Sequence, residues 1–137
     1  MIGLSAFANK GEEVSKQAVN AFTKDFAGAR NISWEQTNQF VKATFTINDE
    51  VMCAFYTNGG ELQAVVRNIL SDKLPINLLA SLKKEYNGFW ISELFEMASD
   101  DQTTYYVTLE SADKTLVLRS VGTNGWNVFS KTRKEAE

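Results

Sequence analysis

Three glutamates on predicted strands are the residues of this 137-residue chain that come nearest to an acid and base pair. They are Glu35, Glu93 and Glu96. Two carboxylates in different surroundings can divide the roles of proton donor and proton acceptor. A cleft between the two halves of the chain would have to bring them together, whereas glutamates on strands are more often solvated. A carboxylate-based enzyme therefore stays open as the alternative function.

Other common catalytic chemistries lack their residues. The chain has no histidine, which removes the usual general base, the serine-histidine-aspartate triad and the commonest metal ligand. The single cysteine, Cys53, lies in an apolar run, and its alternation with Val51 and Phe55 predicts a buried strand position. The sequence therefore predicts no catalytic residue, no metal site and no cofactor.

Charge and hydropathy narrow the range of partners. The formal net charge is -3, and no basic stripe is dense enough for a phosphate backbone. The basic cluster Lys131-Thr132-Arg133-Lys134 is followed at once by Glu135, which is typical of a solvated tail. Stacking of bases on exposed aromatic rings is a weaker possibility, which the acidic balance opposes. No run approaches the roughly 20 apolar residues of a membrane helix, so we expect neither a nucleic-acid partner nor an integral membrane segment.

The first eight residues end in an Ala-x-Ala pattern, Ala6-Phe7-Ala8, and the chain turns polar at Asn9. The pattern is similar to the end of a secretory signal peptide, but the basic region and the longer apolar core are missing. Residues 1–11 are therefore either the remnant of a signal peptide or a flexible lead-in. The first reading predicts a periplasmic or secreted protein.

A doubled pattern indicates how the chain is built. Thr57-Asn58-Gly59 recurs as Thr123-Asn124-Gly125 about 66 residues later, and Phe26-Ala27-Gly28 has a counterpart in Tyr86-Asn87-Gly88 about 60 residues later. We expect a longer hairpin loop at residues 99–102 to absorb the difference, because loops tolerate insertion. Coincidence is the alternative, since Asn-Gly is a common hairpin turn and glycine a common helix stop. A true duplication predicts two similar units, residues 12–70 and 71–137, in one compact domain.

Periodicity predicts the same elements in both halves. Helical spacing covers residues 13–27, and the only proline, Pro75, opens a second helix that ends near Tyr86. Alternating apolar runs predict strands over residues 31–37, 40–47, 51–57 and 61–66, and again over 90–98, 103–110, 115–121 and 126–131. The predicted fold class is α+β: tandem α-β-β-β-β repeats that form one largely antiparallel sheet with both helices on one face.

This fold would leave one sheet face open, made of the strand residues out of phase with the core. The predicted face contains Lys42, Thr44, Met52, Tyr56, Gln63, Val65 and Arg67, and in the second half Tyr106, Thr108, Glu110, Val117, Arg119, Phe129 and Lys131. Aromatic rings and arginines are good contact anchors, because they bury a large area at low entropic cost. A solvated face with incidental cross-strand pairs is the alternative, and an error of one residue in register would exchange the two faces.

Several fold-setting residues give the chain a family resemblance between about residue 13 and residue 131. They are Ala18, Phe22 and Phe26 in the first helix, Asn31-Ile32-Ser33-Trp34-Glu35 in the first strand, Ala43 and Phe45, Ala54-Phe55-Tyr56 before Asn58-Gly59, Leu74-Pro75, and Tyr86. The chain resembles the PepSY-like family of β-lactamase-inhibitor-like proteins, exported proteins of Bacteroidetes-type bacteria. The resemblance implies a concave sheet backed by helices that binds an enzyme through its sheet face, and it implies no catalytic residue.

Together these points favour a non-enzymatic binding module of the bacterial envelope. We expect it to hold an unidentified protein or peptide on the open sheet face. The predicted anchors are Tyr56, Arg67, Tyr106, Arg119 and Phe129.

Overall fold

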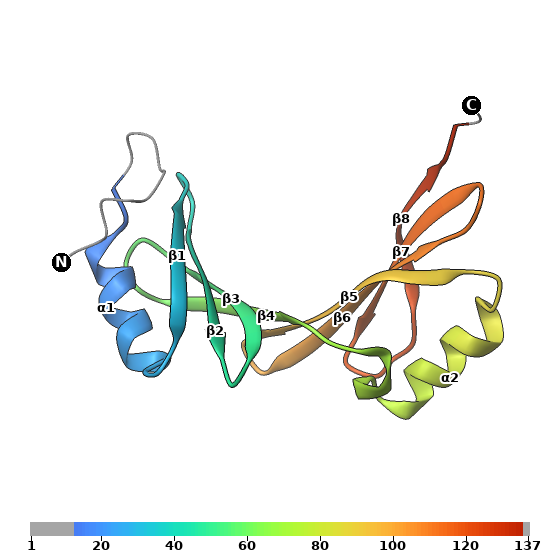
Figure 1. Ribbon diagram of the computed structural model, residues 1–137, viewed down its shortest axis with the longest axis horizontal. Coiled ribbons are helices and arrows are strands. Elements are labelled where there is room, and N and C mark those ends of the chain that lie inside the picture. Colours follow the sequence, from blue (N-terminus) through green and yellow to red (C-terminus); the bar gives the residue numbers. More distant parts are fainter. Residues whose placement is uncertain (1–12, 136–137) are drawn as a thin grey trace. The chain divides into compact units, whose positions relative to one another are not determined.

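The computed structural model describes residues 13–135 of the chain, and residues 1–11, predicted as a lead-in, lie outside this part. The chain forms two compact units that divide between Arg67 and Asn68. Each unit contains one helix followed by four strands, as Figure 1 shows. The repeated α-β-β-β-β order predicted from the doubled patterns is therefore present.

The elements lie close to their predicted ranges. The first unit has α1 (Lys16–Asp25), β1 (Arg30–Gln36), β2 (Val41–Ile47), β3 (Glu50–Tyr56) and β4 (Leu62–Asn68). The second has a 3₁₀ turn (Ser71–Lys73), α2 (Ile76–Glu85), β5 (Trp90–Ser99), β6 (Gln102–Glu110), β7 (Lys114–Val121) and β8 (Asn127–Arg133). Hydrogen-bonded neighbours follow the chain order within each unit, and each of these pairs is antiparallel. The α+β class with antiparallel sheet is confirmed.

The repeated aromatic-x-Gly pattern marks the same helix ending in both units. The N–H groups of Phe26 and Tyr86 each donate to a carbonyl four residues earlier, at 2.9 Å in both cases. The chain then turns back, with a hydrogen bond from Ala29 N–H to Phe26 O at 3.0 Å and its counterpart from Phe89 at 3.1 Å. Gly28 has φ of 96°, the left-handed conformation that glycine adopts without strain.

The two cores fill equivalent positions with different side chains. In α1 the buried pair is Ala18 and Phe22, whereas in α2 it is Leu78 and Leu82. One small and one large residue thus correspond to two residues of middle size, a change that approximately conserves volume. The core of the first unit is mainly aromatic as a result, and the core of the second is rich in leucine.

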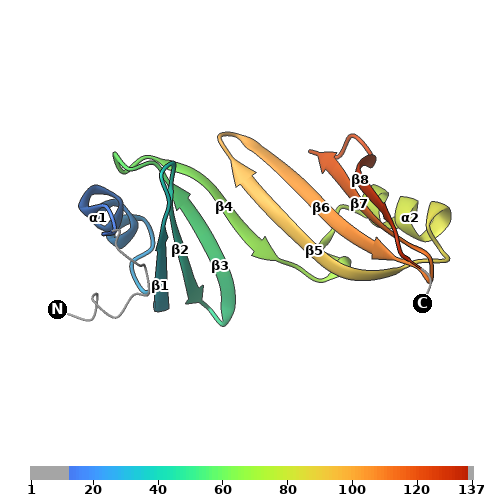
Figure 2. The same ribbon diagram turned by 90° about the horizontal axis from the view of Figure 1, so that it is seen from above.

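In each unit, one face of the sheet is covered by the helix of that unit and the other face is without a helix (Figure 2). We call the second face the open face of that unit. In β2 the helix-covered face carries Val41, Ala43 and Phe45, all buried, while Lys42 and Thr44 point to the open face. In β6 the buried Val107 and Leu109 mark the covered face. The alternation of apolar and polar residues in these two strands predicted their faces correctly.

The expectation of a longer hairpin loop at residues 99–102 is wrong. β5 ends at Ser99 and β6 begins at Gln102, so Asp100 and Asp101 alone make the turn, with Asp100 at φ of 54°. β5 and β6 have 10 and 9 residues, compared with 7 in each of β1 and β2. The additional residues of the second unit therefore lengthen its first hairpin and leave the turn tight.

The predicted faces of β3 are exchanged in the structure. Met52, Ala54 and Tyr56 pair with Phe45, Ala43 and Val41 of β2, and directly paired residues share a face. Tyr56 is fully buried beneath α1, and Cys53 lies on the open face, partly exposed, with its Sγ 3.6 Å from Oγ1 of Thr44. The prediction of a buried Cys53 is therefore wrong.

Glycine at position 60 is required by a close approach as well as by its backbone angle. Its φ is 93°, and a Cβ atom there would lie 2.9 Å from the carbonyl oxygen of Gln17 in α1. Gly125 has a similar φ of 107°, with no atom within 4 Å of such a Cβ. We therefore expect Gly60→Ala to destabilise the protein by more than Gly125→Ala, which should cost about 1–2 kcal/mol through backbone strain. Urea unfolding of both variants measures the difference, and equal losses would contradict the steric account.

Candidate functional site

An aromatic cluster lies on the open face of the second unit. Phe95 of β5 and Tyr106 of β6 are direct cross-strand partners, with rings stacked at a centroid distance of 5.0 Å. The ring of Phe129 in β8 meets that of Tyr106 edge to face at 5.5 Å. The guanidinium of Arg119, opposite Tyr106 on β7, lies 5.1 Å from the centre of the Phe129 ring. We call these four residues the aromatic cluster.

The cluster is accessible and holds an uncompensated cation. Phe129 is 55% exposed, and Arg119 is also exposed. Within residues 13–135, the Arg119 guanidinium makes no ion pair. The contact that it does make is the cation–π contact with the ring of Phe129. Rigid rings beside an available arginine can bury a partner's apolar side chain and bind a carboxylate next to it.

The open face of the first unit carries a smaller arrangement of the same kind. The rings of Phe40 and Phe55 meet edge to face at 5.4 Å. The Nζ atom of Lys42 lies 5.8 Å from the centre of the Phe55 ring. This group contains two rings and a flexible ammonium, so it offers less preorganised contact area than the aromatic cluster.

The structure divides the predicted anchors into two groups. Tyr106, Arg119 and Phe129 lie together on one open face. Tyr56 does not, because it lies in the core under α1. Arg67 pairs with Met52 on the helix-covered face and binds Glu50 at 3.2 Å. Placing Tyr56 and Arg67 on the open face was therefore wrong, and sequence analysis missed Phe95, which the alternation of β5 does not separate from Leu94.

Tyr56 has a structural role that its burial makes clear. Its hydroxyl donates to Oδ2 of Asp25 at the end of α1, at 2.8 Å, and its ring meets that of Phe22 edge to face at 6.5 Å. Burial, together with the hydrogen bond to Asp25 and the charge of that residue, raises the pKa of Tyr56 well above its usual value of 10.0. The hydroxyl therefore joins sheet to helix and is not available to a ligand.

We expect Tyr56→Phe to lower the free energy of unfolding by about 1 kcal/mol, the usual net value of one hydrogen bond. Because the folded-state pKa is raised, the unfolded tyrosine ionises first, so wild-type stability should be complete below pH 10.0 and fall as the pH rises above it. The variant should lose part of this alkaline sensitivity. Urea unfolding at neutral and alkaline pH measures both effects, and the same alkaline decline in the variant would exclude Tyr56 as its source.

The three glutamates considered for catalysis do not form a pair within a unit. Glu93 and Glu96 pair with Thr108 and Tyr105 in β6, and these two partners lie on opposite faces of the sheet. Glu35 belongs to the first unit, where it lies opposite Lys42. Among the described residues there is also no group of three or more side chains that could hold a metal ion. The structure of each unit therefore supplies no acid and base pair from this set.

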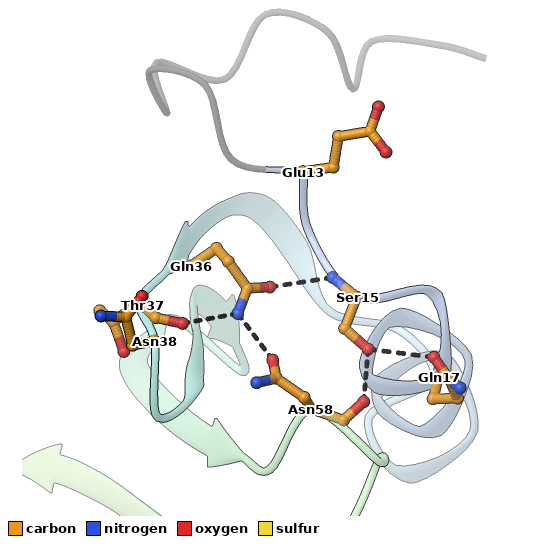
Figure 3. A pocket seen from close by; sticks show the side chains of 7 residues that line it. All are labelled: Glu13, Ser15, Gln17, Gln36, Thr37, Asn38 and Asn58. Carbon is orange, nitrogen blue, oxygen red and sulfur yellow. Dashed lines mark hydrogen bonds between the residues drawn. The ribbon is translucent and has the colours of Figure 1, made fainter.

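A polar depression of about 590 Å³ lies at the N-terminal end of α1 (Figure 3). The amide of Gln36 bridges it: Oε1 accepts from Ser15 N–H at 3.0 Å, and Nε2 donates to Asn58 Oδ1 at 2.6 Å. Ser15 Oγ donates to the carbonyl oxygen of Asn58 at 2.7 Å. These hydrogen bonds fasten α1 to the Thr57-Asn58-Gly59 turn, which gives the groups they join a structural role.

The second unit has a corresponding connection, which gives the doubled Thr-Asn-Gly pattern a structural meaning. Asn77 Nδ2 in α2 donates to the carbonyl oxygen of Thr123 at 3.0 Å. Trp126, just after the same turn, donates from Nε1 to the carbonyl oxygen of Leu78 at 3.0 Å. In both units the turn between the third and fourth strands is thus tied to the start of the helix.

A second polar group fixes the end of β8. Glu110 accepts hydrogen bonds from Lys134 at 3.0 Å and from Thr115 and Ser92 at 2.9 Å, and these bonds lower its pKa. Nζ of Lys134 also donates to the carbonyl oxygen of Ser111 and lies 5.3 Å from the centre of the Trp90 ring. The carboxylate of Glu110 is fully engaged, so this group is a structural clamp.

Comparisons with known proteins identify the fold. No protein-family model and no curated protein matches the chain. Among solved structures, a BLIP-like protein from Bacteroides fragilis has a TM-score of 0.72 at 17% identity, over 89% of this chain and 87% of that one. A protein of Bacteroides eggerthii described as periplasmic gives 0.78 at 12% identity, over 89% and 90%. A DUF2874 family protein from Bacteroides ovatus gives 0.77 at 12% identity, over 90% and 89%.

These likenesses show that the chain has the fold of BLIP-like Bacteroides proteins. They agree with the β-lactamase-inhibitor-like part of the resemblance seen in the sequence, while the PepSY-like assignment is not confirmed.

Within residues 13–135, neither helix has the length and apolar character needed to span a bilayer.

Proposed function

We propose that the chain is a non-enzymatic binding module of the bacterial envelope that holds a protein or peptide partner on the open face of its second unit. The observation that carries the proposal is the aromatic cluster, in which side chains from four successive strands meet on a face without a helix. Its anchors are Phe95, Tyr106, Arg119 and Phe129. Tyr, Phe and Arg are enriched in protein interfaces, and held rings lose little entropy on binding.

Two further points support the proposal. Structural neighbours include a BLIP-like protein and a protein described as periplasmic, which favours an inhibitor-like or adaptor-like role outside the cytoplasm. The Ala6-Phe7-Ala8 pattern fits export, although it lies outside the described residues. Within each unit, the glutamates considered for an enzyme do not come together, so no specific observation favours the catalytic alternative.

Affinity capture from a native envelope fraction tests the proposal. The wild-type chain should retain a defined partner, and a variant combining Tyr106→Ala, Arg119→Ala and Phe129→Ala should lose it. The matched control combines Phe40→Ala, Lys42→Ala and Phe55→Ala on the open face of the first unit, and it should retain the partner. Equal capture by both variants, each with wild-type melting temperature, would exclude the aromatic cluster as the binding site.

A further inference from the structure

We propose that the outer edge of β8 is a docking site for an extended, acidic segment of a partner protein, which adds to the sheet of the second unit as one more strand. This site is distinct from the open face, because it uses backbone groups and the charges of the edge. Addition of a strand to an exposed edge is a recurrent mode of peptide recognition, in which main-chain hydrogen bonds supply affinity and side chains supply specificity.

The edge is unpaired and accessible. In the described part of the chain β8 has one strand neighbour, β7, and all seven of its residues are exposed. Its register with β7 is continuous from Ser130 to Arg133, after an irregularity that contains Phe129. The edge strand of the first unit, β1, is less suitable, because its register shifts between Arg30 and Ser33 and Asn31 has φ of 54°.

The backbone of β8 presents its free donors at defined residues. The N–H group of Lys134 donates to the carbonyl oxygen of Asp113, on the β7 side, at 2.9 Å. Successive residues of an antiparallel strand direct their backbone groups to opposite sides, so the N–H groups of Arg133 and Lys131 point away from β7. The contacts of Lys134 with Glu110 and Ser111 hold this end of the strand in place before any partner arrives, which lowers the entropic cost of docking.

Charge selects the kind of strand that fits. β8 contains Lys131 and Arg133 and no acidic residue. A second copy of β8 would bring two further cations to the same edge, and charged edge residues commonly prevent such self-association. An extended segment with acidic side chains would instead place carboxylates beside these cations. The same charges therefore reject a second copy and admit an acidic strand.

Amide hydrogen exchange of the full chain, followed by NMR, tests the site with two probes. One is a short peptide of alternating glutamate and valine, and the other is its lysine and valine counterpart. The acidic peptide should slow exchange at Lys131 and Arg133 and leave Thr132, which faces β7, nearly unchanged. The basic peptide should have no effect. Equal effects of the two peptides, or no slowing at β8 by the acidic one, would overturn the proposal.

Variants of Lys131 separate the contribution of its backbone N–H group to peptide binding from the contribution of its side-chain charge. Lys131→Pro removes the outward N–H group at an edge position where proline is tolerated, and it should abolish protection by the acidic peptide. Lys131→Gln keeps the N–H group and should weaken binding by about two- to five-fold, as expected for an exposed ion pair. If Lys131→Pro disturbs the β7–β8 pairing, Lys131→Glu with Arg133→Glu serves instead and should shift preference to the basic peptide.

Tyr106→Ala distinguishes this proposal from the proposed function. It removes a central ring of the aromatic cluster without changing the edge, so the acidic peptide should still protect β8. Retained protection together with lost capture of the envelope partner would support both sites. Loss of peptide protection in Tyr106→Ala would show that the peptide binds the open face, and would contradict the edge site.

Discussion

Tyr106→Ala is expected to weaken binding of the captured partner by roughly 30-fold or more, equivalent to about 2 kcal/mol or more, the threshold of an interface hot spot. The reason is the position of the ring, which is stacked on Phe95 and touches the edge of Phe129. Removing it eliminates its own contact area and leaves both neighbouring rings without support. Isothermal titration of the captured partner with wild type and variant measures the change.

The control for Tyr106→Ala is Phe55→Ala, an aromatic truncation on the open face of the first unit, where the ring contacts Phe40. It should change the dissociation constant by less than about three-fold, the effect of a contact outside the hot spot. A larger effect of Phe55→Ala than of Tyr106→Ala would move the binding site to the first unit.

Phe22→Ala is expected to destabilise the first unit by about 3–5 kcal/mol, a large part of the stability of an ordinary domain. Phe22 is 2% exposed, and its ring contacts those of Phe26, Trp34 and Phe45 at centroid distances of 5.0–5.4 Å. The truncation leaves a cavity among rigid rings that cannot easily close. Urea unfolding followed by circular dichroism measures the loss.

The matched control is Phe129→Ala, the same truncation at a residue that is 55% exposed. A surface substitution of this kind usually changes stability by no more than about 0.5 kcal/mol. Similar losses for both variants would contradict the assignment of Phe22 to the core and of Phe129 to a functional surface.

The elements of this fold were predictable because their signals are local. Glycine after an aromatic residue, proline before a helix and Asn-Gly between apolar runs each depend on the conformation of a few neighbouring residues. The doubled order of these signals also predicted the repeat. The extra length of β5 and β6 was not predictable, because a tight Asp100-Asp101 turn and a longer loop both fit the same polar residues.

The faces of strands were predictable only where polar and apolar residues alternate. In β2, Lys42 and Thr44 separate clearly from the buried residues. In β3 both phases are apolar: Val51, Cys53 and Phe55 alternate with Met52, Ala54 and Tyr56, so periodicity cannot choose between them. The face of β3 that is buried is decided by how its side chains fit under α1 and by the hydrogen bond from Tyr56 to Asp25. That bond joins residues 31 positions apart in the sequence.

The same limit explains the outcome for the candidate site. Tyr106 and Arg119 were predicted correctly on the same open face because β6 and β7 alternate strongly. Phe95 was missed, because Leu94 and Phe95 are both apolar and only their partners on β6 tell them apart. Its stacking on Tyr106 is a cross-strand contact that the order of residues in β5 does not reveal.

The central claim, that the open face of the second unit binds a partner, is tested most directly by site-specific photocrosslinking in intact cells. A photoreactive phenylalanine analogue replaces Phe95 on the open face in one variant and Lys83, an exposed residue of α2, in the other. We predict a discrete crosslinked protein from position 95 and none from position 83. Crosslinking from position 83 with none from position 95 would contradict the account.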